Sequence, residues 1–182
     1  MVLKKIPAFF LLLSFGLVLA ACASGGRASG RLPASPLPLA VYVQPFANLT
    51  TTPDAGRSVT VLLDAELRRH RSFRVVSPAS LPFPVPAGVS ATGMSPALRE
   101  RLIAAGVGAF LSGSVIEYAY RSELESEPVV GISWTMTDLS TGRVLWSSSL
   151  SGVGGCFLGC RATLTSLSGA LIAREVSRFV GR

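Results

Sequence analysis

The hydrophobic positions of residues 38–78 change from a continuous run to a helical period and back. Residues 38–46, PLAVYVQPF, are apolar almost throughout, which predicts a strand buried on both faces of a sheet. From Pro53 to His70 apolar residues recur at helical spacing, with Thr52 as the N-cap. Residues 72–78 predict a second strand. Strand, helix and strand in this order predict a right-handed βαβ unit with parallel strands.

The middle of the chain is a proline-rich stretch followed by a second predicted helix. Residues 79–96 contain four prolines and predict a loop or an extended arm. Ser95 and Pro96 match the N-cap and first position of a helix. The residues of this helix expected to face inward are Leu98, Leu102 and Ala105.

The second half alternates polar and apolar residues with the period of a strand. Residues 129–139, VVGISWTMTDL, have two distinct faces. One face holds Val130, Ile132, Trp134 and Met136, and the other holds Gly131, Ser133, Thr135 and Thr137. Strands are also predicted at residues 109–120 and 144–152, with a hairpin turn at 138–143 in which Gly142 supplies a positive φ.

The predicted element order is βαβαβββα, with a last helix over residues 162–180. Three consecutive strands joined by short turns predict an antiparallel meander with one wet face. The fold class expected is therefore α/β: a single domain over residues 38–182, with a mixed β-sheet covered by helices.

The N-terminus has the pattern of a secretory signal over residues 1–21. Lys4 and Lys5 precede an apolar run, residues 7–19, that is too short to span a bilayer comfortably. The sequence Leu-Ala-Ala-Cys ending at Cys22 resembles the lipobox of bacterial lipoproteins, and this resemblance implies that Cys22 is acylated. The alternative is an ordinary cleaved signal followed by a chance cysteine. Residues 22–37 predict a flexible tether, because Ala, Ser, Gly, Pro and Arg dominate them.

The net charge does not indicate a nucleic-acid partner. Removing Lys4 and Lys5 with the signal lowers the net charge from +7 to +5 and leaves arginine as the only strong base. The one dense basic run, residues 68–71, lies at the predicted end of a helix, where cations are favoured. A solvated helix end is therefore expected in place of a binding patch.

The motifs of enzymes and metal sites are missing from the sequence. The single histidine, His70, sits at the end of a basic helix, so we expect no Ser–His pair. Gly108 and Gly113 have the spacing of a phosphate loop, but Ser114 replaces the lysine. Cys156 and Cys160 suit a local disulfide or two free buried thiols better than a zinc site. We therefore expect no enzymatic activity, no cofactor and no metal.

Two stretches carry a resemblance to a known family. In residues 39–78 an apolar strand ending in PF.N.T leads to a helix and an F.VV strand, and this resembles the opening of a group of outer-membrane lipoproteins. Residues 138–149, DLSTGRVLWSSS, resemble the later hairpin of that group, in which a D..TG.V.W turn joins two strands. The group includes the curli-secretion channel CsgG, the cell-wall synthase activator LpoB, and PelC of Pel polysaccharide export.

Among these three proteins, the short predicted tether and the modest length of the chain most resemble those of PelC. A channel like CsgG would need added membrane-crossing segments, and an activator like LpoB would need a longer tether. The resemblance implies a lipoprotein anchored at the periplasmic face of the outer membrane, forming a homo-oligomeric ring that guides polysaccharide to an export barrel. The alternative is a lipoprotein that activates a cell-wall synthase.

Three groups of residues are candidate contact sites. An acidic turn is either a solvated tip or part of a collar that attracts a cationic polymer; it holds Glu123, Glu125 and Glu127. Trp134 and Trp146 pack in the core or contact membrane or a neighbouring subunit. The apolar residues Phe157 and Leu158, in a loop before the last helix, are candidates for the same contacts.

Overall fold

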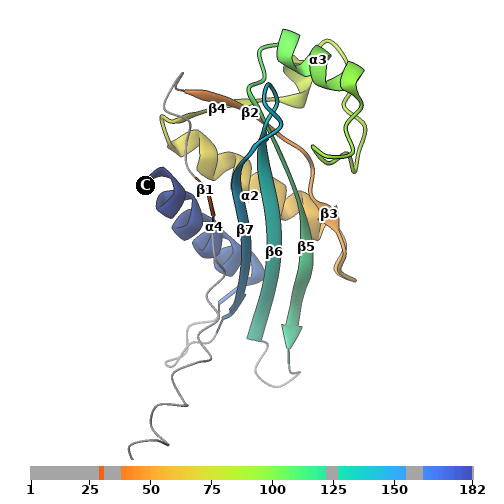
Figure 1. Ribbon diagram of the computed structural model, residues 1–182. Coiled ribbons are helices and arrows are strands. Elements are labelled where there is room, and N and C mark those ends of the chain that lie inside the picture. Colours follow the sequence, from red (N-terminus) through yellow and green to blue (C-terminus); the bar gives the residue numbers. More distant parts are fainter. Residues whose placement is uncertain (1–28, 31–37, 122–126, 155–161, 182) are drawn as a thin grey trace, which may run out of the picture.

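Strand β2, Leu39–Val43, lies inside a mixed sheet and is buried along its whole length, as its continuous apolar run predicts. The computed structural model describes residues 29–30, 38–121, 127–154 and 162–181 of the chain. Alternate β2 side chains enter two separate hydrophobic clusters, one on each face of the sheet. Helices cover both faces at this point (Figure 1).

The sheet has seven strands in the order β1-β7-β6-β5-β2-β4, with β3 paired to β5. Their bounds are β1 Ser29–Gly30, β3 Ala47–Asn48, β4 Phe73–Val76, β5 Ala109–Arg121, β6 Glu127–Asp138 and β7 Val144–Val153. β2 runs parallel to both β4 and β5, and β3 also runs parallel to β5. β6 is antiparallel to both β5 and β7. The predicted βαβ unit, the meander and the α/β class are therefore confirmed.

Helices α2, Ala55–Arg69, and α4, Leu164–Val180, lie side by side on one face of the sheet (Figure 1). Their apolar faces and the inward faces of the strands form the larger hydrophobic cluster. Burial of these side chains stabilises the fold, because each Å² of apolar area removed from water contributes about 25 cal/mol. The opposite face of β5, β6 and β7 has no helix of the described residues along most of its length.

Helix α2 begins later than the sequence predicts. Its N-cap is Asp54, in a left-handed conformation with φ 57°, and Thr52 does not cap it. The Thr52 hydroxyl donates instead to the carbonyl oxygen of Tyr118, on β5. Asn48 holds the intervening turn, because its amide donates to the Thr52 carbonyl and its side-chain oxygen accepts from Thr50. The PF.N.T motif thus fixes the connection from β3 to α2.

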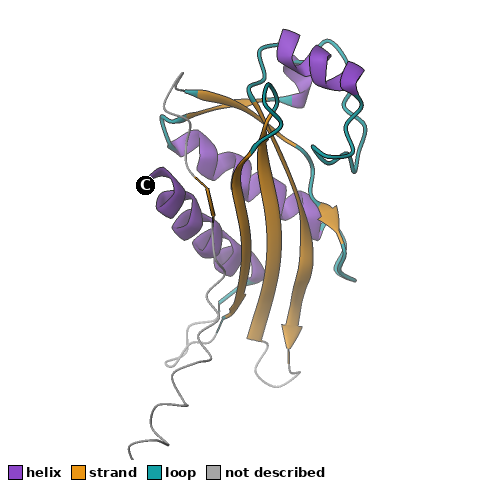
Figure 2. Cartoon of the chain, viewed as in Figure 1, coloured by secondary structure: helices purple, strands orange, loops and turns teal. Residues whose placement is uncertain are grey.

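The proline-rich segment does not extend as an arm, and together with a short 3-10 helix, η1 (Pro78–Ser80), and α3 (Pro96–Ala104) it forms a cap at one end of the sheet (Figure 2). Phe83 and Met94 are buried in the second hydrophobic cluster, and the guanidinium of Arg101 lies 4.0 Å from the centroid of the Phe83 ring. Ser95 caps α3 as predicted. Leu102 is buried, but Ala105 is exposed because it lies at the C-cap, where the helix ends.

Residues 29–30 lie within the segment that the sequence assigns to a flexible tether, yet they pair with β7 as an edge strand. A β-carbon on Gly30 would lie 2.1 Å from the carbonyl oxygen of Leu145. The absence of a side chain therefore permits this close approach, which a composition-based prediction of disorder could not detect.

Candidate functional site

Trp134 and Trp146 are the predicted contact residues that the structure places most clearly. Their exposed fractions are 2% and 0%, and their rings pack edge to face with centroids 5.1 Å apart. Side chains this deeply buried offer no surface to a membrane or a neighbouring subunit. The contact role predicted for the two tryptophans is therefore wrong, and their alternative role in the core is confirmed.

Most other predicted site residues lie outside the described residues. These are Cys22, Glu123, Glu125, Cys156, Phe157, Leu158 and Cys160. Glu127 begins β6 and is half-buried opposite Arg121 in the register of β5 and β6. Arg121 in turn bridges Glu117 with a nitrogen–oxygen distance of 2.7 Å. The last glutamate of the acidic turn therefore lies opposite a cation in the register of the sheet.

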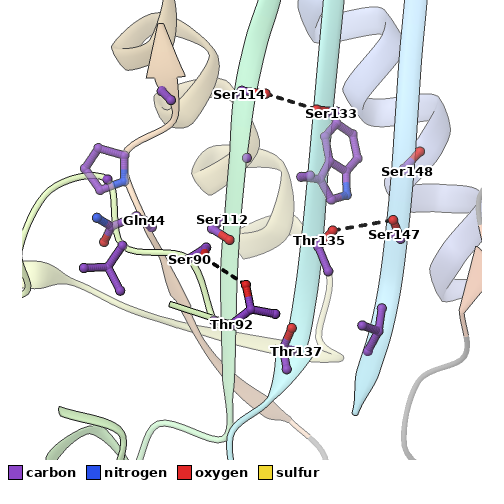
Figure 3. A pocket seen from close by; sticks show the side chains of 18 of the residues that line it. Gln44, Ser90, Thr92, Ser112, Ser114, Ser133, Thr135, Thr137, Ser147 and Ser148 are labelled. Carbon is purple, nitrogen blue, oxygen red and sulfur yellow. Dashed lines mark hydrogen bonds between the residues drawn. The ribbon is translucent and has the colours of Figure 1, made fainter. Parts of the chain in front are cut away.

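A groove of about 600 Å³ lies on the face of the meander opposite α2 and α4. Its floor is formed by β5, β6 and β7, and its rim by the end of β2, the loop over residues 88–92 and the turn before β7. Figure 3 shows side chains from the three strands facing this common space. The volume lies within the range of small-ligand sites.

The floor of the groove carries hydroxyl groups. They belong to Ser112, Ser114, Ser133, Thr135, Thr137, Ser147 and Ser149. Two hydrogen bonds cross neighbouring strands, between the hydroxyls of Ser114 and Ser133 at 3.1 Å and of Thr135 and Ser147 at 3.5 Å (Figure 3). Of the described strand residues that face the groove, none is charged. Every one of these hydroxyls can both donate and accept a hydrogen bond.

Gln44, which follows β2, forms one wall of the groove and is 2% exposed. Its side-chain nitrogen donates to the carbonyl oxygen of Pro86 at 2.8 Å. Its side-chain oxygen is buried and has no hydrogen-bond partner among the described residues. Burial of an unpaired amide oxygen is costly, so this atom is an acceptor in need of a donor.

The rim near β7 is held by the turn that the sequence predicts. Asp138 accepts hydrogen bonds from the Ser140 hydroxyl at 2.6 Å and the Thr141 backbone N–H at 2.8 Å. Burial raises the pKa of Asp138, but these hydrogen bonds outweigh burial and hold its pKa below the usual value. Gly142 has φ 72°, as predicted, and lies beside the guanidinium of Arg99. Arg99 is the cation that lines the groove.

The hydroxyls of the groove suit it to hydrogen-bonded binding. Among the described residues no histidine lies beside its serines, because His70 lies at the end of α2, where it contacts Glu66 at 3.2 Å. The described residues contain no cluster of His, Cys, Asp or Glu that could hold a metal ion. None of the described helices is long and apolar enough to cross a membrane.

The sequence located the polar face of β6 correctly but did not identify the groove. Ser133, Thr135 and Thr137 are predicted to share one face of the strand, and all three line the groove, although Thr137 is only 7% exposed. The sequence WSSSLS in β7 continues this row of polar residues, and its serines could have indicated that the polar face extends onto the neighbouring strand. The position of Gln44 in the groove wall could not be predicted from the sequence, because it depends on the folding of residues 86–92 over the end of β2.

No protein-family model matches the sequence, and no curated protein does. Among solved structures, a PelC dodecamer from Paraburkholderia phytofirmans is 29% identical, with a TM-score of 0.65, over 86% of this chain and 98% of that chain. A second PelC dodecamer from the same organism is 28% identical, with a TM-score of 0.65, over 85% of this chain and 96% of that chain. The lipoprotein GNA1162 from Neisseria meningitidis shares the fold, with a TM-score of 0.51 and 22% identity over 79% of this chain and 99% of that one. The predicted resemblance to this group of lipoproteins is confirmed.

Proposed function

We propose that this chain is a lipid-anchored periplasmic subunit of an outer-membrane apparatus that exports an exopolysaccharide. Identical subunits form a ring that guides the polymer to an outer-membrane barrel by contact and charge, without catalysing a reaction. The observation that carries this proposal is the similarity to two PelC dodecamers, which extends over almost the whole length of those chains.

The lipobox-like sequence and the position of β1 support the anchor. Cys22 is separated from the start of β1 by residues 23–28 only. A chain of that length spans at most about 24 Å even when fully extended. Two or more acyl chains on Cys22 would hold the protein stably on a bilayer. The pairing of Ser29 and Gly30 with β7 would then keep this edge of the sheet near the membrane surface.

An exposed apolar surface supports contact between subunits. Leu49 is 67% exposed and Ile116 is 54% exposed. They lie close together, because the backbone N–H of Leu49 donates to the carbonyl oxygen of Val115 at 2.9 Å. Burial of such side chains against another subunit is favourable. In a closed ring, each copy would present this surface to a different surface of the next copy.

The mass of the acylated protein in detergent tests the ring. We expect an assembly of many identical subunits, and a monomer would contradict the proposal. Leu49→Asp should shift the mass toward the monomer, because a carboxylate would be buried at the subunit contact. Val61→Asp on α2 is the matched control, since Val61 is 60% exposed and should leave the mass unchanged.

Labelling with palmitate tests the anchor. The wild type should incorporate the label and sediment with outer membranes, whereas Cys22→Ala should lose both properties. Cys156→Ala is the control that should keep them. Label retained by Cys22→Ala would refute acylation at this residue.

A further inference from the structure

We infer that the groove on the open face of the meander is a low-affinity binding site for an uncharged segment of a glycan. The site is formed by the hydroxyls of β5, β6 and β7 and by Gln44 (Figure 3). The inference rests on the proposed function, because the exported polymer is the ligand with matching chemistry. The inference goes beyond the proposed function in two respects: it locates a binding site on the subunit, and it states that the sugar units bound there are uncharged.

The first reason is the match between the groove and a sugar. Sugar hydroxyls donate and accept hydrogen bonds at nearly every position, and serine and threonine hydroxyls rotate to do the same. The groove crosses the sheet from the end of β2 through β5 and β6 to β7. Three strand spacings correspond to about 14 Å, enough for a few linked sugar rings lying across the strands.

The second reason is the buried side-chain oxygen of Gln44, which accepts no hydrogen bond from the described residues. It lies in the groove wall, beside the loop over residues 88–92. An N–H or O–H of a bound sugar would supply the missing donor after a small shift of this side chain. An amide acceptor of this kind gives the groove a fixed point among adaptable hydroxyls.

The third reason is that the groove is unlike a protein–protein interface. Interfaces are depleted in serine and enriched in aromatic residues and methionine. Here serine dominates the floor, and the single aromatic residue among the lining residues, Trp134, is 2% exposed with its ring packed against Trp146. The surface is also hollow, so a flat neighbouring subunit would leave its hydroxyls unpaired.

Weak binding follows from the same features. No exposed aromatic face lies among the lining residues, so a sugar ring gains hydrogen bonds without stacking. Because hydroxyl contacts exchange readily with water, their net contribution is small. A polymer can therefore pass along such a groove without being held. Arg99 at the rim disfavours cationic sugar units, because like charges repel.

Titration of the mature protein in detergent with three oligosaccharides tests the inference. The neutral probe is the tetramer of N-acetylglucosamine, the cationic probe is its deacetylated form, and the anionic probe is tetragalacturonate. We expect the neutral tetramer to bind most tightly and to shift the NMR signals of β5, β6 and β7. Tighter binding of tetragalacturonate, abolished by Arg99→Gln, would overturn the inference in favour of an anion site.

Variants identify the groove as the place of binding. Ser133→Ala with Thr135→Val removes two hydroxyls at nearly constant shape and should weaken binding of the neutral tetramer by about fivefold or more. The matched control is Ser58→Ala with Ser177→Ala, which removes two exposed hydroxyls from the helical face and should leave binding unchanged. Ser149→Trp should block the groove from its exposed side.

Three further outcomes would overturn the inference. One is unchanged binding by Ser133→Ala/Thr135→Val and by Ser149→Trp. Another is a change in the mass of the assembly in either variant, which would mean that the groove holds a neighbouring subunit. The third is a wild-type ring that forms and exports polymer but binds none of the probes. In that last case the proposed function stands and only the glycan site fails.

Discussion

The indole of Trp146 lies parallel to the phenyl ring of Phe179, with centroids 4.5 Å apart and planes inclined by 3°. The contact joins β7 to the end of α4 and continues through Phe179 to Phe73 on β4, whose ring centroid lies 6.3 Å away. Trp146 is the tryptophan of the D..TG.V.W motif, so this motif positions a residue that connects the sheet to the helical layer. Its role is structural.

Trp146→Ala should therefore destabilise the domain strongly. Loss of a fully buried aromatic side chain, together with the cavity it leaves, costs about 3–5 kcal/mol. Denaturant unfolding followed by circular dichroism measures the change. Val144→Ala, two residues earlier on the same strand, removes a side chain that is 58% exposed and should change stability by less than about 0.5 kcal/mol. Similar values for the two variants would contradict the packing described here.

Two helical glycines should respond to alanine in opposite directions. A β-carbon on Gly56 in α2 would lie 2.3 Å from the carbonyl oxygen of Phe46, so Gly56→Ala must move the helix away from the segment between β2 and β3. We expect a loss of about 1–3 kcal/mol, despite the better helix propensity of alanine.

Gly169 in α4 is the matched control, because a β-carbon there meets no atom within 4 Å among the described residues. Gly169→Ala should therefore stabilise the domain by about 0.5–1 kcal/mol. Thermal unfolding of the two variants and the wild type measures both changes. A stabilised Gly56→Ala would show that α2 does not approach the backbone of Phe46 this closely.

The turn that holds the groove rim should weaken in acid. The pKa of Asp138 is lower in the folded protein than the unfolded value of about 3.9, because Ser140 and Thr141 donate to its carboxylate. A lowered folded-state pKa means that this stabilisation is present above the unfolded pKa and is lost as the pH falls through the folded pKa.

Asp138→Asn should cost about 1 kcal/mol at neutral pH, a modest value because the carboxylate is partly exposed. The difference in unfolding free energy between wild type and variant should then shrink as the pH is lowered below about 4. Unfolding at neutral pH and in acid gives both numbers. A difference that stays constant with pH would mean that the carboxylate charge does not hold this turn.

The pairing of β1 with β7 depends on the missing side chain of Gly30. Gly30→Val should detach this strand, because its β-carbon would overlap the backbone of Leu145. Trypsin should then cleave faster at Arg27 and Arg31, which flank β1 in the sequence, while the unfolding midpoint changes little because only two residues are released. Ser29→Ala is the control and should be cleaved at the wild-type rate. Equal cleavage of Gly30→Val and the wild type would show that β1 does not protect these sites.

Local patterns in the sequence were sufficient to predict the elements and the class of fold. The local signals are the continuous apolar run of β2, the helical spacing of apolar residues in α2 and the alternation of polar and apolar residues in β6. Each of them depends only on which side chains are buried away from solvent. The turn at Asp138 and Gly142 was also predictable from the sequence, because the side-chain hydrogen bonds and the positive φ that form it lie within a few consecutive residues. The Ser95 cap of α3 was predicted for the same reason.

Features that depend on contacts between distant segments could be identified only in the folded chain. Thr52 follows the sequence rule for an N-cap, yet it donates to Tyr118 because β5 lies beside it. Gly30 lies in a segment whose composition predicts a flexible tether, but in the fold it packs against the backbone of Leu145. Gln44 follows a predicted strand, and only the folding of residues 86–92 over it places it in the groove wall. Trp134 and Trp146 could face a membrane or a core, and the packing of α4 on the sheet placed them in the core. Local pattern fixes the conformation of a segment, whereas the side chain's partner is set by the long-range packing of the whole fold.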